Sequence, residues 1–231
     1  MKIENVNVKF NDLTVFNDQN FEFYDGKINC ITGPSGCGKT TLLNYIAGLL
    51  NKRRITEDIG YIFQEPRLLP WMTVMKNITL FIPENYSKTE KKDMAENILN
   101  QVGLSDFAGY YPDKLSGGMR HRVSIARAFC CPCSLLLMDE PFAGQDLKNK
   151  NELITLFLKL WEKDKKTVIA VTHDFSEIWR IGDSITVLSP LPAEILLKEK
   201  VEISHNMREN LEFSELKTET ERRVREILLK V

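Results

Sequence analysis

Hydrophobic side chains follow three patterns along the chain. Residues 3–10 and 20–24 alternate between apolar and polar side chains, as half-exposed strands do. Three nearly continuous apolar runs occupy residues 27–32, 134–138 and 167–172. Residues 151–163, between the last two runs, repeat with helical spacing. Apolar strands joined through a helix are typical of a parallel sheet covered on both faces, so these parts predict an α/β fold.

The middle of the chain has helical patterns instead. Ser87 and Glu90 have the spacing of a capping box, and Gly103 stands where a helix C-terminal cap is expected. One face of that helix would carry Met94, Ile98, Leu99 and Val102. Ser116 is the expected N-cap of a second helix, which ends before Pro132. These helices predict a helical segment inserted into the α/β fold.

Composition limits the classes of function. The 231 residues carry 31 Lys and Arg against 32 Asp and Glu, a formal charge of −1, so overall charge would not hold the protein on nucleic acid. With 43% hydrophobic and 27% charged residues the chain should fold as a globular protein. No apolar run reaches the length of about 20 residues that a membrane-spanning helix needs, and the first residues lack the apolar core of a secretory signal.

The five cysteines predict thiols in a reducing compartment. Their number is odd, and Cys130, Cys131 and Cys133 are too close together for a framework of paired disulfides. A metal site on this cluster would need further Cys or His ligands at a matching spacing. We expect small buried side chains at a helix end and leave the role of the cluster open.

Residues 33–40, Gly-Pro-Ser-Gly-Cys-Gly-Lys-Thr, match the phosphate-binding P-loop between a predicted strand and a predicted helix. Glycines let successive backbone N–H groups turn toward an anion, and the helix N-terminus adds its dipole. In such a loop Lys39 reaches the β and γ phosphates and the Thr40 hydroxyl binds Mg²⁺. A chance glycine-rich turn is the alternative.

Two carboxylates end the apolar run before Pro141. Asp139 and Glu140 follow a buried strand, where they can face bound phosphates. Beside a P-loop, Asp139 would hold Mg²⁺ and Glu140 would position and polarise the attacking water. The alternative is a pair of solvated loop carboxylates.

Residues 115–120, Leu-Ser-Gly-Gly-Met-Arg, open the helix capped by Ser116 and form a second N-terminal anion site. With these motifs the chain, from about residue 3 to 200, resembles the ATP-binding subunits of ABC transporters. In that family residues 115–119 correspond to the signature motif, Gln64 to the Q-loop, residues 135–140 to Walker B and His173 to the switch histidine. The five motifs stand in the family's order.

The resemblance implies the fold and the site. It predicts a P-loop NTPase (RecA-like) core with a mostly parallel sheet, a short antiparallel β subdomain and an inserted helical subdomain. A single ABC ATPase domain over 1–231 would comprise a nucleotide-binding core (1–65 and 134–200), the helical subdomain (66–133) and a tail helix (201–231). The apolar residues expected to pack that tail are Leu216, Val224, Ile227 and Leu228.

The implied cofactors are ATP and Mg²⁺. The implied catalytic residues are Lys39, Gln64, Glu140 and His173, and the implied metal ligands are Thr40, Gln64 and Asp139. The implied nucleotide contacts are Phe10, Gly33, Pro34, Ser35, Gly36, Cys37, Gly38, Lys39, Thr40, Thr41, Ser116, Gly117 and Gly118. Phe10 would stack on adenine, although a strand phenylalanine is also compatible with plain core packing. His121 and His205 have no such context, and we expect them at the surface.

Residues 64–74 point to partners. Their sequence looks like the branch of importer ATPases that serves nitrate, sulfonates, taurine and pyrimidine-type vitamin precursors. Leu68, Leu69 and Trp71 would form part of a groove for a helix of the transmembrane permease, or alternatively a small core under the helical segment. The family also implies a second ATPase subunit, in a homodimer with ATP between the copies. It further implies an extracytoplasmic solute-binding protein and a peripheral location on the cytoplasmic face of the membrane.

Three departures from the family pattern affect these expectations. The interval from Lys39 to Gln64 is short, which predicts a trimmed β subdomain. Gln145 replaces the usual leucine of the D-loop, at a place expected to touch the opposite subunit. A basic strip along the signature helix is expected on a solvated or phosphate-neighbouring face rather than on nucleic acid, and comprises Arg120, His121, Arg122 and Arg127.

Two other classes of P-loop protein are the alternatives for this chain. A soluble ABC-type ATPase that acts on nucleic acid or ribosomes usually has a coiled-coil insertion or two ATPase modules, and this chain has neither. An ordinary P-loop kinase would leave the signature motif and His173 without a role.

Overall fold

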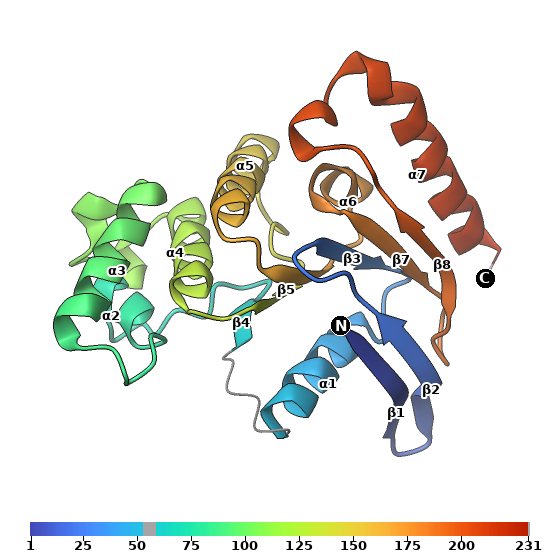
Figure 1. Ribbon diagram of the computed structural model, residues 1–231, viewed down its shortest axis with the longest axis horizontal. Coiled ribbons are helices and arrows are strands. Elements are labelled where there is room, and N and C mark those ends of the chain that lie inside the picture. The colour runs from blue at the N-terminus through green and yellow to red at the C-terminus, as the bar shows by residue number, and fades with distance from the viewer. Residues whose placement is uncertain (53–58, 231) are drawn as a thin grey trace. The chain divides into compact units, whose positions relative to one another are not determined.

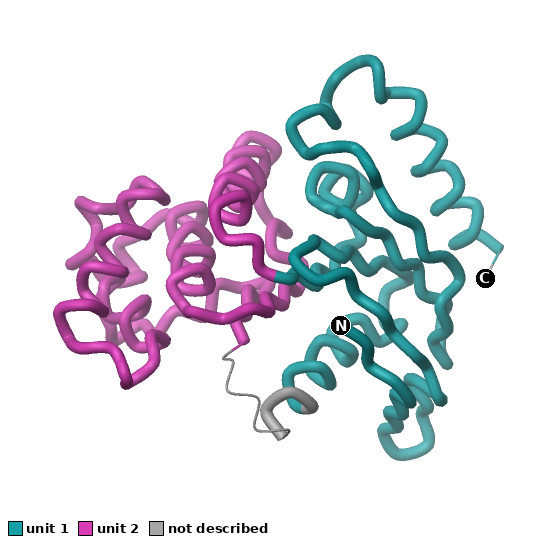
Figure 2. Tube along the Cα trace, in the orientation of Figure 1, with its two compact units in different colours: residues 1–54, 167–231 teal, residues 55–166 magenta. Residues whose placement is uncertain are grey.

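The computed structural model describes residues 1–52 and 59–230 (Figure 1). The chain has two compact units (Figure 2). Unit 1 comprises Met1–Arg54 and Thr167–Val231, and unit 2 comprises Ile55–Lys166.

The sheet of unit 1 is built on three parallel strands. β3 (Ile28–Thr32) lies between β6 (Thr167–Val171) and β7 (Ser184–Leu188), and β8 (Ile195–Lys200) is antiparallel to β7. Every residue of β3 and β7 is buried, as expected for strands covered on both faces. Helix α1 (Lys39–Lys52) contacts β6, and α6 (Phe175–Ile181) contacts β3.

A separate antiparallel hairpin precedes this sheet in the sequence. β1 (Lys2–Phe10) pairs with β2 (Leu13–Glu22) across a two-residue turn in which Asn11 has a φ of 50°. The second strand expected over 20–24 is present but has other bounds, because β2 begins at Leu13 and ends at Glu22. Exposed polar residues and a bulge at Asp18, where φ is 52°, break the alternation that the sequence pattern relies on.

The last part of unit 1 comprises η3 (His205–Met207), η4 (Leu211–Phe213) and α7 (Ser214–Leu229). Arg208 fixes it to the end of α6, because its guanidinium donates to the carbonyls of Trp179 and Gly182 at 2.9 and 2.6 Å. The expectation that His205 lies at the surface is wrong. Its side chain is largely buried, with Nε2 2.8 Å from the carbonyl oxygen of Ile181.

Unit 2 joins a short parallel strand pair to helices. β4 (Ile59–Ile62) pairs with β5 (Leu135–Asp139). The helices are α2 (Val74–Thr79), α3 (Lys88–Gln101), α4 (Gly117–Cys130) and α5 (Leu147–Lys163), with 3₁₀ turns η1 (Ser105–Phe107) and η2 (Pro112–Lys114).

Local signals set the ends of these helices. The capping box of Ser87 and Glu90 is present, Gly103 follows α3 with a φ of 70°, and Ser116 caps α4, as predicted. Helix α5 begins four residues before the apolar pattern, because the Asp146 carboxylate accepts from the N–H of Asn149 and caps it there.

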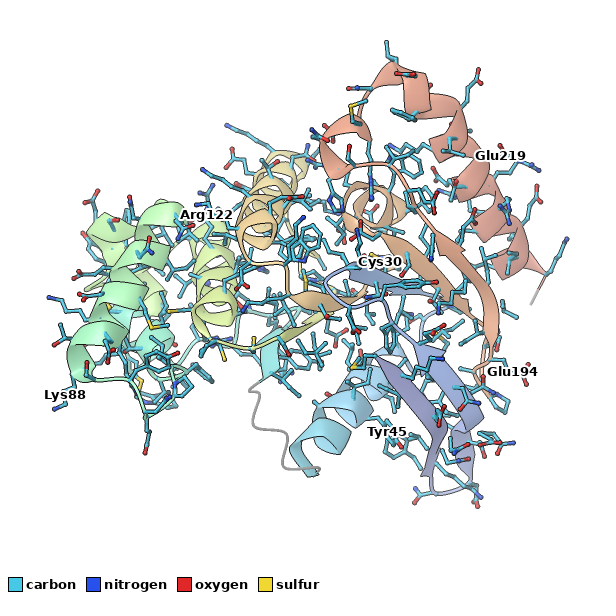
Figure 3. All side chains as sticks on the ribbon, viewed as in Figure 1. Cys30, Tyr45, Lys88, Arg122, Glu194 and Glu219 are labelled. Atoms are coloured by element: carbon cyan, nitrogen blue, oxygen red, sulfur yellow. The ribbon has the colours of Figure 1, made fainter. Side chains whose placement is uncertain are left out.

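Aromatic residues form the centre of unit 2. Phe157 of α5 makes edge contacts with Phe129 of α4 and Phe142 after β5, with ring centroids 5.8 and 6.1 Å apart. Arg122 of α4 (labelled in Figure 3) donates to Glu152 of α5 at 2.8 Å. The helix that begins at the signature is therefore tied to the helix that follows Walker B.

The predicted fold class is confirmed: an α/β fold with a mostly parallel sheet, a small antiparallel sheet and helices. The division into a core (1–65 and 134–200), a helical subdomain (66–133) and a tail (201–231) stays a prediction. Part of the interval predicted to be trimmed, residues 53–58, lies outside the described residues. Among the helices of 1–52 and 59–230, none is long and apolar enough to cross a membrane.

Candidate functional site

The P-loop of unit 1 joins β3 directly to α1. The chain leaves the buried strand at Thr32, turns through residues 33–38, and enters α1 at Lys39. The N–H of Cys37 donates to the carbonyl of Pro34 at 3.3 Å within this turn. The predicted context of strand, glycine-rich loop and helix N-terminus is present.

Among the three loop glycines with positive φ, Gly36 and Gly38 lie well inside the region that favours glycine and have different surroundings. Gly38 has a φ of 98°, and a β-carbon there would lie 2.4 Å from Cγ1 of Val15. Gly36 has a φ of 80°, and a β-carbon there would meet nothing within 4 Å. Gly38 is therefore required both by its backbone conformation and by close packing on β2, whereas Gly36 is required by conformation alone.

The Lys39 side chain folds back over the loop. It is 8% exposed, and its ammonium group donates to the carbonyls of Gly33 and Pro34 at 2.9 and 2.8 Å. These two hydrogen bonds keep a positive charge inside the turn of the P-loop, where the loop's N–H groups also favour an anion.

His173 lies at the same edge of the sheet as the P-loop. β3 and β6 are adjacent and parallel, so the loops that follow them leave the sheet on the same side. His173 is exposed in the loop after β6. Its neighbour Asp174 caps α6 by accepting from the N–H of Ser176 at 2.8 Å, which fixes the point where the loop enters α6. Unit 1 thus brings the P-loop and His173 together.

Unit 2 brings Gln64 and the two carboxylates to one edge in the same way. β4 and β5 are parallel, with Ile62 opposite Met138, so Gln64 follows one strand where Asp139 and Glu140 end the other. Gln64 is exposed, and both carboxylates are partly buried.

The backbone of Glu140 is strained. Its φ is 44°, a left-handed conformation that costs a residue with a side chain about 1 kcal/mol or more. The surrounding structure therefore holds Glu140 in a conformation it would not adopt alone, which is common for residues at functional sites.

Burial, and then the charge of nearby Asp139, raise the pKa of Tyr61 on β4.

The signature residues start α4 of unit 2. The Ser116 hydroxyl accepts from the N–H of Met119 at 3.3 Å, and Ser116 and Gly117 are exposed while Gly118 is partly buried. Leu115 is buried and its carbonyl accepts from Arg120 at 2.6 Å, which anchors the start of the helix. The helix end that we expect to bind an anion is thus formed, and its first residues are exposed.

The basic strip expected along α4 is not one solvated face. His121 is 7% exposed and its ring bonds to the backbone of Pro141, just after Walker B, while burial lowers its pKa. Arg127 is 5% exposed and donates to the carbonyls of Pro66 and Arg67, both at 3.0 Å. Both were expected near solvent, and both instead satisfy backbone carbonyls inside unit 2.

Loop 64–74, the segment after β4, is held by a side chain that sequence patterns did not single out. Asn77 is fully buried; its amide donates to the carbonyls of Leu69, Met72 and Thr73, and its oxygen accepts from the N–H of Leu69 at 2.7 Å. On this framework Trp71 is 69% exposed. A polar residue at a buried helix position was the only sequence signal for Asn77.

Phe10 is an exposed aromatic side chain. It ends β1 opposite Leu13, and both are more than half exposed. Its position therefore leaves its ring open to a stacking partner rather than in the core.

The expected oxygen ligands for Mg²⁺ are of the right chemistry but belong to different units. The Thr40 hydroxyl lies in unit 1, and Gln64 and the Asp139 carboxylate lie in unit 2. Hydroxyl, amide and carboxylate oxygens are donors that this cation prefers. Within residues 1–52 and 59–230, no group of three or more His, Cys, Asp or Glu side chains is arranged to hold a metal ion.

A strand-to-helix P-loop, carboxylates at the end of a second strand and a capped signature helix define an ATP-binding protein of the P-loop class. The chain belongs to the ABC transporter family, because the model of that family matches residues 16–143. As a member of this family the chain is an ATPase.

Three relatives show which ABC transporter proteins the chain resembles in sequence. An uncharacterised ABC transporter ATP-binding protein of Methanocaldococcus jannaschii is 37% identical over 93% of this chain and 87% of its own. An aliphatic sulfonates import ATP-binding protein of Pseudomonas syringae pv. tomato is 39% identical over 79% of each chain. A taurine import ATP-binding protein of Rhizobium johnstonii is 40% identical over 72% of this chain and 68% of its own.

Solved structures agree on the fold. A dimeric ATP-binding cassette in a post-hydrolysis state, bound to ADP and Pi, has a TM-score of 0.72 and 30% identity, and covers 88% of this chain and 99% of that one. A dimeric bacterial ABC transporter cassette has a TM-score of 0.73 and 31% identity at the same coverage.

Proposed function

We propose that this chain is the ATP-hydrolysing subunit of an importer, and that it drives solute movement through transmembrane permease subunits from the cytoplasmic face of the membrane. The relatives named for sulfonate and taurine import support an importer of small solutes that carry a sulfonate group. The solute itself would be chosen by an extracytoplasmic binding protein and the permease.

The observation that carries the coupling role is Trp71. A large aromatic side chain that is 69% exposed is costly to leave in water, yet loop 64–74 is fixed around it by Asn77 and Arg127. A rigid loop presenting an exposed aromatic anchor is the usual form of a protein interface. Leu68 and Leu69, both half-buried beside it, would complete the contact with a permease helix.

Within one subunit the proposed roles follow from the two edges described above. Lys39 would exchange its bonds with the carbonyls of Gly33 and Pro34 for bonds with the β and γ phosphates. Glu140 would accept a proton from the attacking water, and His173 would bind the γ-phosphate. Mg²⁺, bound through Thr40, Gln64 and Asp139, would neutralise charge on the phosphate oxygens.

The complete site would lie between two copies of the chain. ATP held by the P-loop of one copy would be covered by Ser116, Gly117 and Gly118 of the other. The dimeric form of the solved cassettes supports this arrangement. Closure would be favoured by the shared γ-phosphate and released by hydrolysis, which supplies the differential interaction that a two-state cycle needs.

Co-purification with the permease tests this proposal. We expect a permease gene to lie beside the gene of this chain, the wild-type chain to co-purify with that permease, and its ATPase activity to rise with the loaded binding protein. The Trp71→Ala variant should no longer co-purify with the permease. Leu211→Ala, which removes another exposed apolar side chain, is the matched control and should retain it. ATPase activity indifferent to the permease and stimulated by DNA or ribosomes would favour the soluble ATPase instead.

A further inference from the structure

Two cysteines between α4 and β5 take no part in the proposed ATPase chemistry. The N–H of Cys133 donates to the carbonyl of Cys131 at 2.8 Å, which closes a three-residue γ-turn around Pro132. The turn brings the backbones of the two cysteines together, and the Cys133 side chain is hydrogen-bonded to that of Cys131. Such closeness is the first requirement for a disulfide between them.

A buried cation stands beside this pair. Lys166 is 4% exposed, and its ammonium group donates to the carbonyls of Cys131 and Cys133 at 3.2 and 2.7 Å. The hydrogen bond from Cys131 and the charge of Lys166 together outweigh burial and lower the pKa of Cys133 to about 7. For the neighbouring thiol burial outweighs the charge of Lys166 and raises the pKa of Cys130 to about 11.

One member of the pair, Cys131, borders a cavity. Cys131 lines a cavity of about 230 Å³ inside unit 2, together with Tyr61, Arg67 and Arg127. A peroxide molecule is small enough for such a cavity.

We propose that Cys131 and Cys133 are a redox-active dithiol that hydrogen peroxide oxidises to a disulfide within the chain. One thiolate of the hydrogen-bonded pair attacks a peroxide oxygen, the O–O bond breaks, and the leaving hydroxide takes a proton to become water. The other thiol then attacks the resulting sulfenic sulfur, the S–S bond forms, and a second water leaves. Two thiols are oxidised by two electrons, one peroxide is reduced, and added dithiol reductant reverses the change.

Thiol counting and mass spectrometry on the full-length protein test the proposal. Peroxide should remove two of the five thiols and 2 Da per chain, with the loss mapped to the peptide that carries residues 131–133. Dithiothreitol should restore both thiols. The rate should rise with pH through about 7, following the pKa of Cys133.

Variants identify the sulfur atoms. Cys133→Ser and, separately, Cys131→Ala should each abolish the two-thiol loss, and Cys130→Ser, the matched control one residue away, should keep it. Equal thermal midpoints would show that the variants fold. The proposal is overturned if wild-type protein keeps five thiols, if the disulfide links two chains, or if oxidation maps to Cys30 or Cys37.

Discussion

Single side chains connect the parts of unit 2 that carry the proposed chemistry. His121 joins the signature helix to the residue after Walker B, and Arg127, two turns later, joins the same helix to loop 64–74. Both are buried polar groups whose N–H donors are satisfied by backbone carbonyls. A buried donor without a partner would cost about 1–3 kcal/mol. Their roles are visible only at the level of atoms.

The burial of His121 predicts a pH dependence of stability. Burial lowers its pKa in the folded state, so the unfolded chain binds more protons as pH falls below about 6.5. The free energy of unfolding should be fully retained above that pH and decrease below it. Denaturant unfolding at pH 5 to 8 measures this slope. His121→Gln, which keeps an N–H donor for Pro141, should flatten it, and an unchanged slope would contradict the assignment.

The two P-loop glycines predict a graded pair of variants. Gly36→Ala should destabilise by about 1 kcal/mol, the cost of a side chain in a left-handed conformation, and should still bind ATP. Gly38→Ala should cost more and weaken ATP binding, because its β-carbon would collide with Val15 as well. Thermal unfolding and nucleotide titration measure both effects. Equal behaviour of the two variants would show that contact with β2 does not shape the loop.

At the scale of elements, loop 64–74 depends on the helices around it. Asn77 of α2 and Arg127 of α4 supply the bonds that fix its backbone, and the ring of Phe81 lies 5.0 Å from the Arg127 guanidinium. An irregular segment can present Trp71 in one orientation only when such groups hold it.

Removal of the Arg127 guanidinium tests this support. Arg127→Met should lower the free energy of unfolding by about 2 kcal/mol, because two backbone carbonyls lose their donors. Limited proteolysis within 64–74 should also become faster. Arg122→Met is the matched control on the same helix, since its partly exposed ion pair with Glu152 is worth about 1 kcal/mol or less. Equal losses in the two variants would contradict the supporting role of Arg127.

Elements with strong local signals were predictable from sequence. The P-loop, the capping box of α3 and the Ser116 cap are set by residues close together in the chain. The start of β2 was not, because its bulge at Asp18 interrupts the alternation. The burial of His121, Arg127 and His205 was not predictable either, since each is satisfied by a carbonyl at least 20 residues away, which composition and spacing do not reveal.

At the scale of the whole molecule, the site residues fall into two groups that unit 1 and unit 2 assemble separately. The P-loop and His173 share one edge, and Gln64, Asp139 and Glu140 share another. The proposed function joins these groups around ATP and adds the signature residues of a second copy. The spacing of residues predicts the motifs. The assembly of two chains could be predicted only from resemblance to the family, because the motifs of one chain do not show it.

Lys39→Ala tests the nucleotide site without reference to the dimer. Loss of the ammonium group removes the charge that the phosphates would pair with, so binding of ATP should fall at least tenfold. Nucleotide titration by calorimetry or fluorescence measures the change, with thermal unfolding as the check on folding. Unchanged affinity for ATP would contradict the assignment of the P-loop.

The most direct test of the central proposal is the association state of Glu140→Gln in the presence of ATP and Mg²⁺. Without the carboxylate that accepts the water's proton, hydrolysis should slow by roughly 10²–10⁴-fold. Analytical ultracentrifugation should then show a stable dimer with two ATP bound, absent without nucleotide. A variant that stays monomeric at saturating ATP, beside a wild type whose specific activity is independent of protein concentration, would contradict a site shared between two chains.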